Sequence, residues 1–94
     1  MTNSTTKLLR IHGIVQGVNY RRWMQKEAQG LGVLGWARNR QDGTVEALVH
    51  GSPEQVENLM RACHEGPMVA RVDKVEAEDA EYDGSTDFRV ESTV

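Results

Sequence analysis

The residue types that could do chemistry gather in one short stretch, from Gly13 to Arg22. It places two glycines, Gly13 and Gly17, ahead of two adjacent arginines, Arg21 and Arg22. Glycine allows turns that bring successive backbone N–H groups to one side, and a guanidinium can hold two phosphate oxygens at once. A helix that begins here would add its free N–H groups and the positive end of its dipole. The stretch therefore predicts a site for phosphate or another oxyanion.

The hydrophobic pattern after the glycines predicts such a helix and separates the two arginines. Gly30 and Gly32 supply a stop, and the apolar stripe at helical spacing consists of Tyr20, Trp23, Met24, Ala28 and Leu31. At about 100° per residue, Arg22 points nearly opposite this stripe, whereas Arg21 flanks it and can lean toward the edge of a sheet. We therefore expect Arg21 to be the anion ligand, the alternative being two solvated arginines on a helix surface.

The spacing of the glycines does not match the common nucleotide motifs. Gly13 and Gly17 are one residue too close for the phosphate loop G-x-x-x-x-G-K-[ST], and no Lys-Ser or Lys-Thr follows them. The stretch is not a dinucleotide fingerprint either. By themselves, these residues predict an oxyanion site made from backbone N–H groups and Arg21.

Strand-like and helical segments alternate along the rest of the chain. A second helix is expected after the capping box of Ser52 and Gln55, with Pro53 at its first position and Gly66 after its end. Apolar runs and alternations predict strands over residues 8–12, 33–39 and 44–50, a weaker edge strand with a bulge over 69–81, and a short last strand over 88–91.

The order of these elements predicts an α+β fold of the ferredoxin-like, split β-α-β kind. Its β-α-β-β-α-β order, plus a short terminal strand, places two helices on one face of a mainly antiparallel sheet. Asp42-Gly43 predicts a hairpin between the second and third strands. The first and second strands run parallel with another strand between them, so their ends share one edge of the sheet. Asn39 should therefore lie near the glycine loop.

The same residues resemble the two signatures of the acylphosphatase family. The first block, Gly13-Ile-Val-Gln-Gly-Val-Asn-Tyr-Arg21, resembles G-x-V-Q-G-V-x-[FY]-R. The second block, from Gly32-Val-Leu-Gly-Trp-Ala-Arg-Asn39 to Asp42-Gly43-Thr-Val-Glu46, resembles G-x-x-G-[FYW]-[AV]-x-N-x-x-[DE]-G-x-V-E. The resemblance implies a small enzyme that hydrolyses acyl phosphates, which are carboxyl-phosphate mixed anhydrides, to a carboxylate and inorganic phosphate.

The resemblance also implies a role for particular residues, with no metal and no organic cofactor. Arg21 corresponds to the phosphate-binding arginine, and Asn39 corresponds to the asparagine that orients the attacking water. The backbone amides of the phosphate cradle are those of Val15, Gln16, Gly17, Val18, Asn19 and Tyr20. From the residues alone, the commoner role for Asn39 is that of a turn residue that caps the hairpin, which is a frequent use of asparagine.

Length and composition place limits on the class of protein. The chain has 94 residues, a formal net charge of -3 and one cysteine. We expect a flexible tail over residues 1–7 and a single domain over residues 8–94, without an internal disulfide and without a signal peptide or membrane span. These features favour a cytoplasmic monomer, and the slight acidity argues against nucleic acid as a partner.

Several other residues that could do chemistry are expected to be structural. Cys63 lies at a buried helix position, and the acidic side chains of residues 73–83 are expected to guard an edge strand. His12, His50 and His64 lie on three different elements without a ligand spacing. Trp36 is expected to pack under a helix or to rim the site.

Two other functions remain open at this level. A ferredoxin-like sheet can bind RNA through strand-borne aromatic residues, but residues 44–50 contain none. A domain of this kind can also handle carbamoyl phosphate within a larger enzyme, or bind phosphate without catalysis. The sequence does not name the physiological acyl phosphate.

Overall fold

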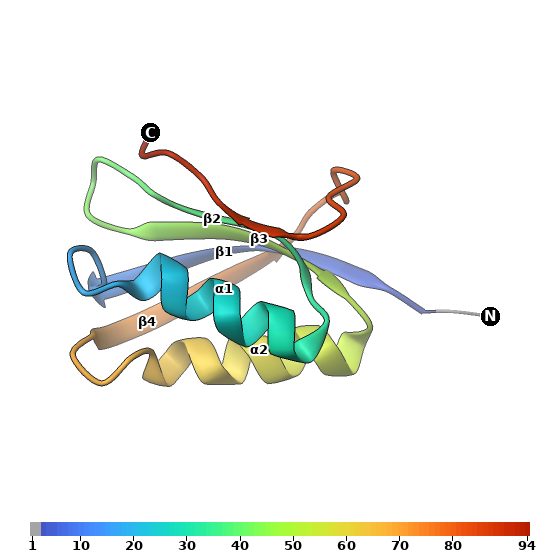
Figure 1. The fold of residues 1–94 in the computed structure, drawn as a ribbon, viewed down its shortest axis with the longest axis horizontal. Coiled ribbons are helices and arrows are strands. Elements are labelled where there is room, and N and C mark those ends of the chain that lie inside the picture. Colours follow the sequence, from blue (N-terminus) through green and yellow to red (C-terminus); the bar gives the residue numbers. More distant parts are fainter. Residues whose placement is uncertain (1–2) are drawn as a thin grey trace.

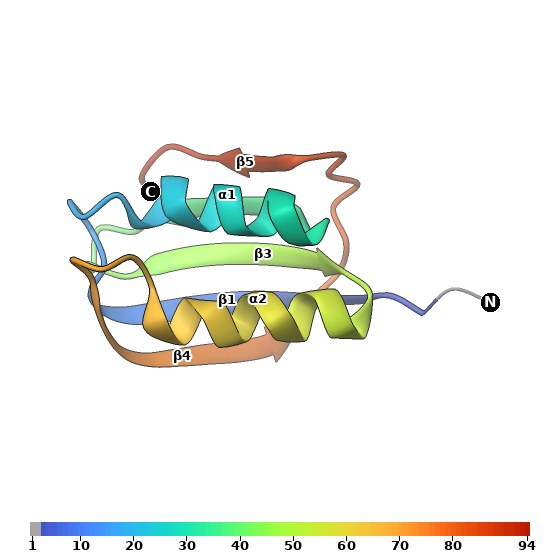
Figure 2. The same ribbon diagram turned by 60° about the horizontal axis from the view of Figure 1, so that its bottom comes forward.

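A computed structural model describes residues 3–94, in which two helices cover one face of a five-stranded sheet (Figure 1). The elements are β1 (Thr5–Ile14), α1 (Tyr20–Leu31), β2 (Leu34–Asn39), β3 (Val45–Gly51), α2 (Pro53–Glu65), β4 (Arg71–Asp79) and β5 (Phe88–Val90). The strand order is β4-β1-β3-β2-β5. Figure 2 shows α1 and α2 side by side along the strands. The predicted ferredoxin-like architecture is confirmed.

The pairing of the strands places the C-terminal ends of β1 and β2 at the same end of the sheet. β3 lies between them and pairs antiparallel with both, from Thr5 opposite Gly51 on one side and from Asn39 opposite Val45 on the other. The predicted hairpin at Asp42-Gly43 is therefore present. β5 pairs parallel with β2 and is the edge strand on the opposite side of the sheet from β4.

The first strand is longer than the sequence predicts at both ends. Thr5 pairs with Gly51, and Lys7 pairs with both Val49 and Asp79. The expectation of a tail over residues 1–7 is therefore wrong for residues 5–7, because β3 and β4 extend far enough to pair with them. Met1 and Thr2 lie outside the described residues.

Gly13 does not end the first strand, because a bulge in β4 lets the strand continue. His12 pairs with Lys74 and Gly13 pairs with Val72, which leaves Asp73 as the extra residue. Gly13 has a φ of 133°, and a Cβ there would lie 2.0 Å from the carbonyl oxygen of Arg71. Only glycine permits this close approach. The bulge and the edge position predicted for β4 are both confirmed.

The end of α1 explains why β2 begins one residue later than predicted. Gly32 adopts a left-handed conformation with φ 78°, and its N–H and that of Val33 bond to carbonyl oxygens in the last turn of α1. The Val33 N–H thus caps the helix instead of joining the sheet. β2 therefore begins at Leu34.

The core lies between the helices and one face of the sheet. The sheet contributes alternate residues that include Leu9, Ile11, Val45, Ala47 and Val49, all of which are fully buried. Tyr20, Met24 and Ala28 come from α1, and Val56, Leu59 and Cys63 come from α2. Burying each large apolar side chain stabilises the fold by about 1.5–3 kcal/mol. In residues 3–94, neither helix has the length and hydrophobicity needed to cross a membrane.

Candidate active site

Six of the eight residues predicted to form the site line one cavity of about 350 Å³. Its lining comes from the loop between β1 and α1, the first turn of α1, the end of β2, and β5, and consists of Val15, Gly17, Asn19, Tyr20, Arg21, Arg22, Asn39 and Val90. Figure 1 shows this loop and the turn between β2 and β3 at the same end of the sheet. Asn39 therefore lies beside the loop, as the parallel placement of β1 and β2 predicts. Gln16 and Val18 belong to the loop but do not line the cavity.

The backbone of the loop has the alternating conformation that suits an anion. Gly17 and Asn19 have φ values of 75° and 65°, and Val18 between them does not have a positive φ. Such alternation turns successive N–H groups toward one concave side. Asparagine is one of the few residues other than glycine that tolerate the left-handed region. This backbone conformation suits an anion, and Asn19 supplies a left-handed position that the glycines alone did not indicate.

The N-terminus of α1 is open, whereas that of α2 is fully capped. In the described part of the chain, the Asn19 side chain makes no capping hydrogen bond, and the first turn of α1 holds no acidic residue. At α2, Ser52 and Gln55 form a reciprocal capping box, and Glu54 adds a negative charge. The first-turn N–H groups of α1 therefore remain available to a ligand in the cavity.

Arg21 is half-buried and held in place by the end of the chain. Its Nη1 donates to the backbone carbonyl oxygen of Glu91 at 2.9 Å. Arg22 also lines the cavity but is exposed. This difference agrees with the helical phase that favours Arg21. The sequence did not indicate Glu91, because a backbone carbonyl carries no residue-type signal.

Asn39 is the last residue of β2, and its side-chain oxygen has an unusual environment. Among the described residues, its Oδ1 is buried and has no hydrogen-bond partner. An unpaired buried acceptor costs about 1–3 kcal/mol and calls for an explanation. Asn39 also lines the cavity, so a small rotation of its side chain would let a water molecule or ligand there donate to this oxygen.

The turn after Asn39 is capped by a different residue. Asp42 Oδ1 accepts hydrogen bonds from the Thr44 N–H at 3.0 Å and the Thr44 Oγ1 hydroxyl at 2.6 Å. These bonds lower the pKa of the Asp42 carboxyl below its usual value. The turn-capping role that the sequence left open for Asn39 thus belongs to Asp42.

Gln16 forms a contact that the sequence did not predict. Its Nε2 donates to the carbonyl oxygens of Arg40 and Thr44, at 2.7 and 2.8 Å. These two carbonyls belong to the turn that follows Asn39. The loop and the turn are therefore joined directly by one side chain.

The face of the sheet away from the helices carries a buried carboxylate surrounded by arginines. Glu46 is 5% exposed and bonds to Arg38 at 2.8 Å, Arg40 at 3.1 Å and Arg10 at 3.4 Å. Burial acts to raise the pKa of Glu46, but hydrogen bonds and charge from Arg38 and Arg40 outweigh it and hold the pKa below its usual value. Arg38 and Arg40 flank Asn39 in the chain, so this cluster holds the backbone on either side of it.

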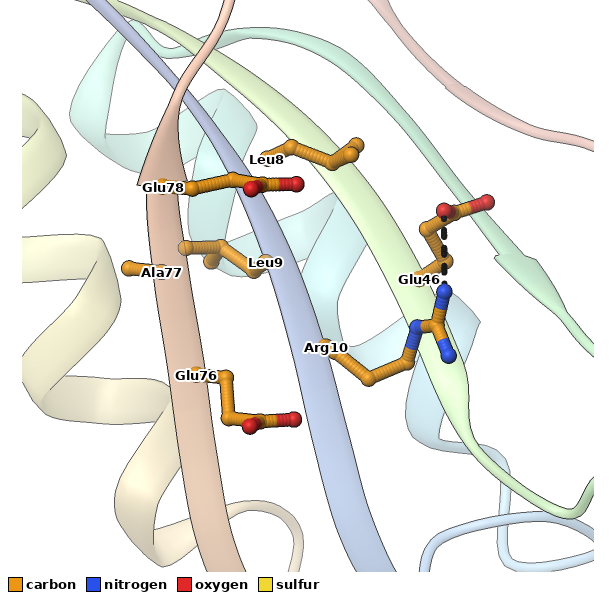
Figure 3. Close-up of a pocket in the computed structure, with 7 residues that line it drawn as sticks. All are labelled: Leu8, Leu9, Arg10, Glu46, Glu76, Ala77 and Glu78. Carbon is orange, nitrogen blue, oxygen red and sulfur yellow. Dashed lines mark hydrogen bonds and ion pairs between the residues drawn. The ribbon is translucent and has the colours of Figure 1, made fainter.

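A second hollow, of about 340 Å³, lies on this open face and includes none of the predicted site residues. Figure 3 shows Glu76 projecting from β4 on the side of Arg10, which bonds to Glu46, and Glu78 projecting beside Leu8. Trp36 lies on this face as well, with its Nε1 donating to Asp83 at 3.1 Å and Arg38 over its ring. Trp36 therefore neither packs under a helix nor rims the cavity.

The three histidines have hydrogen-bond partners and the cysteine is buried, in agreement with the structural roles that the sequence predicts. His12 pairs with Glu76 at 2.6 Å, His50 bonds to Thr6, and His64 bonds to its own helix. Cys63 is buried, and burial raises its pKa to about 12. Among residues 3–94, no three His, Cys, Asp or Glu side chains form a group that could hold a metal ion.

Comparison with known proteins assigns the chain to a family. The sequence model described as Acylphosphatase matches residues 7–90. An acylphosphatase of Acidovorax sp. (strain JS42) is 52% identical over 91 residues, which covers 97% of this chain and 94% of the relative. The chain belongs to the acylphosphatase family. The fold agrees, because an acylphosphatase structure from Coxiella burnetii superposes with a TM-score of 0.91 at 34% identity, over 95% of this chain and 94% of the other.

The acylphosphatase fold also occurs within a larger protein. The structure of HypF from T. kodakarensis matches with a TM-score of 0.84 and 26% identity, over 94% of this chain but only 12% of that chain. The near full-length matches are therefore to proteins of the size of this one. The comparison does not favour a role for this acylphosphatase as a domain of that larger assembly.

Proposed function

We propose that this chain hydrolyses acyl phosphates to a carboxylate and inorganic phosphate, with Arg21 and Asn39 as its catalytic residues. One observation carries the assignment of roles. A single cavity brings together an open helix N-terminus, a guanidinium held by a hydrogen bond, and a side-chain oxygen that has no hydrogen-bond partner within residues 3–94. The first two suit a phosphoryl group, and the third suits a water molecule. Family membership supports the reaction class.

The phosphoryl group is held by backbone N–H groups and by Arg21. The loop from Val15 to Tyr20 supplies the N–H groups, and the dipole of α1 adds positive potential at the same point. Arg21 donates two parallel hydrogen bonds to the phosphoryl oxygens. These contacts strengthen as charge builds on the equatorial oxygens in the transition state.

The attacking water is oriented by Asn39. Its Oδ1 accepts one hydrogen bond from the water, which points a lone pair of the water at phosphorus. A bond forms between the water oxygen and phosphorus, while the bond from phosphorus to the acyl oxygen breaks and its electron pair leaves with the carboxylate. A phosphoryl oxygen takes the water proton. A strong general base is not needed, because the carboxylate is a good leaving group and positioning lowers the barrier.

The finer description of the protein is also part of this proposal. We expect a cytoplasmic monomer that needs no metal or organic cofactor and binds no nucleic acid. The formal net charge of -3 and the single buried cysteine support this description. Size-exclusion chromatography with light scattering tests the monomer, and titration with single-stranded RNA at low salt tests the absence of nucleic-acid binding.

A phosphate-release assay tests the proposed reaction. Benzoyl, acetyl and carbamoyl phosphate are supplied separately, each with and without a chelator. Release from benzoyl and acetyl phosphate that is insensitive to chelator is expected. Turnover of carbamoyl phosphate alone would instead favour the carbamoyl-phosphate-handling function, and phosphate binding without release would favour a non-catalytic module. Loss of activity on chelation would contradict the expectation of a metal-free site.

A further inference from the structure

We propose that the side chain of Gln16 is a positioning residue, which keeps the phosphate loop and Asn39 in register. The phosphate loop is defined here as residues 15–19. The inference rests on the proposed function, because it matters only if the loop holds phosphate and Asn39 orients water. It assigns Gln16 a role through its side chain, separate from the backbone amide that it contributes to the loop.

The side-chain amide of Gln16 donates two hydrogen bonds to the turn that follows Asn39. Its Nε2 donates to the Arg40 carbonyl at 2.7 Å and to the Thr44 carbonyl at 2.8 Å. Arg40 is the residue directly after Asn39. A shift of Gln16 relative to this turn would therefore move phosphorus relative to the oxygen that orients the water.

The turn is already closed by its own backbone, so Gln16 is not needed to form it. The Arg40 N–H donates to Thr44 at 2.9 Å, and the Gly43 N–H donates to Arg40 at 3.1 Å. Both carbonyls bonded to Gln16 are thus acceptors within this turn as well. The Gln16 side chain joins two preformed pieces instead of building one of them.

The sheet itself does not make this connection. Pairing between β1 and β3 ends at Ile11 opposite Val45, whereas β1 continues to Ile14 only along β4. In the described part of the chain, no backbone hydrogen bond joins residues 13–19 to residues 39–44. Among the hydrogen bonds of the described residues, those of the Gln16 side chain therefore link the two halves of the site.

The first test separates turnover from binding in Gln16→Ala and Gln16→Met. Both variants remove the two donors, and methionine keeps nearly the volume of glutamine. We expect kcat to fall about 10–100-fold, because misplacement of a positioned group by about 1 Å has an effect of this size. Inhibition by inorganic phosphate should weaken less than about threefold, because Arg21 and the loop amides remain.

Gln25→Ala is the matched control. Gln25 is also half-buried and donates from its side chain to a backbone carbonyl, that of Phe88, at 3.0 Å. Its bond joins α1 to β5 and does not reach the turn after Asn39. We expect kcat of Gln25→Ala within about twofold of the wild type. Urea unfolding of all variants establishes that each is folded under the assay conditions.

A double-variant experiment decides whether Gln16 acts through Asn39. In an Asn39→Ala background, Gln16→Met should lower kcat by less than about twofold, because the group that it positions is already gone. The same loss in both backgrounds would overturn the inference, as would wild-type turnover in Gln16→Met and Gln16→Ala. Wild-type turnover in Asn39→Ala alone would instead overturn the proposed role of Asn39, so the two failures are distinguishable.

Discussion

Arg21 and Asn39 are proposed to act on the same substrate through different physical effects. Arg21 brings charge, so we expect it to bind phosphate in the ground state and to stabilise the transition state more strongly. Asn39 is neutral and offers one oxygen in a fixed place, so its contribution is orientation. Kinetics on variants can separate these effects, because one acts on both KM and kcat and the other acts on kcat alone.

Arg21→Ala is expected to lose both affinity and turnover. Each charge-assisted hydrogen bond contributes about 1.5–3 kcal/mol, so inhibition by inorganic phosphate should weaken at least about tenfold. The kcat for benzoyl phosphate should fall about 10²–10³-fold. Arg22→Ala is the comparison. Its fall in kcat should be smaller than that of Arg21→Ala by a factor of about ten or more. Near-normal hydrolysis by Arg21→Ala would contradict the assignment.

Asn39→Ala is expected to lose turnover without losing stability. Its kcat should fall about 10²-fold, with inhibition by inorganic phosphate changed less than about threefold. Since Oδ1 has no hydrogen-bond partner among the described residues, removing it breaks no hydrogen bond of the fold, so the free energy of unfolding should not fall. A parallel loss of turnover and unfolding free energy would make Asn39 a structural residue instead.

At the residue scale, the sequence predicted where Arg21 and Asn39 lie better than it predicted their supports. Helical phase placed Arg21, the parallel arrangement of two strands placed Asn39, and both line the cavity. Their roles come from the family resemblance and stay predictions. The Glu91 carbonyl that holds Arg21 and the two carbonyls bonded to Gln16 could not be found, because every residue has a carbonyl. Only the folded chain shows which ones meet a donor.

At the scale of elements, the two helices differ in how their N-termini are satisfied. α2 is closed by its capping box and by Glu54, which makes it a stable support for the sheet. α1 leaves its first-turn N–H groups open to the cavity. The chain thus forgoes a cap, which typically contributes about 1 kcal/mol of stability, where a ligand can take its place.

Asn19→Asp tests the open N-terminus of α1. A carboxylate there places a negative charge where phosphate is proposed to bind, so phosphate inhibition should weaken about tenfold. The effect should shrink at high ionic strength, because salt screens exposed charges. Asn19→Gly alters the same side chain without adding charge and should lose far less. Equal losses in the two variants, unaffected by salt, would count against an electrostatic role.

The Glu46 cluster is an element-scale device, since it joins β1, β2 and β3. The pKa of the Glu46 carboxyl is lowered in the folded state. The cluster therefore contributes its full stability above the unfolded pKa of about 4.3, and this contribution is lost as the pH falls through the lower folded pKa. Glu46→Gln removes the negative charge that the arginines bind, so it should reduce the free energy of unfolding at pH 7. The reduction should be about 1–3 kcal/mol and no larger, because the arginines are partly solvated.

Urea unfolding at pH 7 and at pH 3 measures this difference. The gap between Glu46→Gln and the wild type should narrow at the lower pH, because the wild-type carboxylate itself becomes protonated. Asp79→Asn is the control, since Asp79 belongs to an exposed pair with Lys7 and should have little effect. If the difference in free energy of unfolding between Glu46→Gln and the wild type were the same at both pH values, the cluster would act through packing and not through charge.

Across the whole molecule, the topology was predictable and the ends of the strands were not. Periodicity and turn residues identify each element from its own segment. Thr5–Lys7 joined β1, and Val33 did not join β2, because their partners come from elsewhere in the fold. Such boundaries depend on pairing between distant segments, which a local pattern does not contain.

Reaction of the single thiol reports on the whole fold. Cys63 is buried, and its pKa is raised to about 12, so it should not react with an aromatic disulfide reagent at neutral pH while the protein is folded. One thiol per chain should react on unfolding in urea, in step with the loss of the circular dichroism signal. Rapid reaction in the native protein would place Cys63 at an accessible position and contradict the core described above.

The cavity draws on three parts of the chain that are far apart in sequence, namely the loop before α1 together with the first turn of that helix, the end of β2, and β5. The unfolded chain therefore has no such site, and any anion that occupies it binds the native state alone. Binding energy then adds directly to folding energy and grows with the logarithm of ligand concentration. In a cell that accumulates phosphate, the product of the reaction would itself protect the enzyme against heat and proteolysis, at the expense of some inhibition.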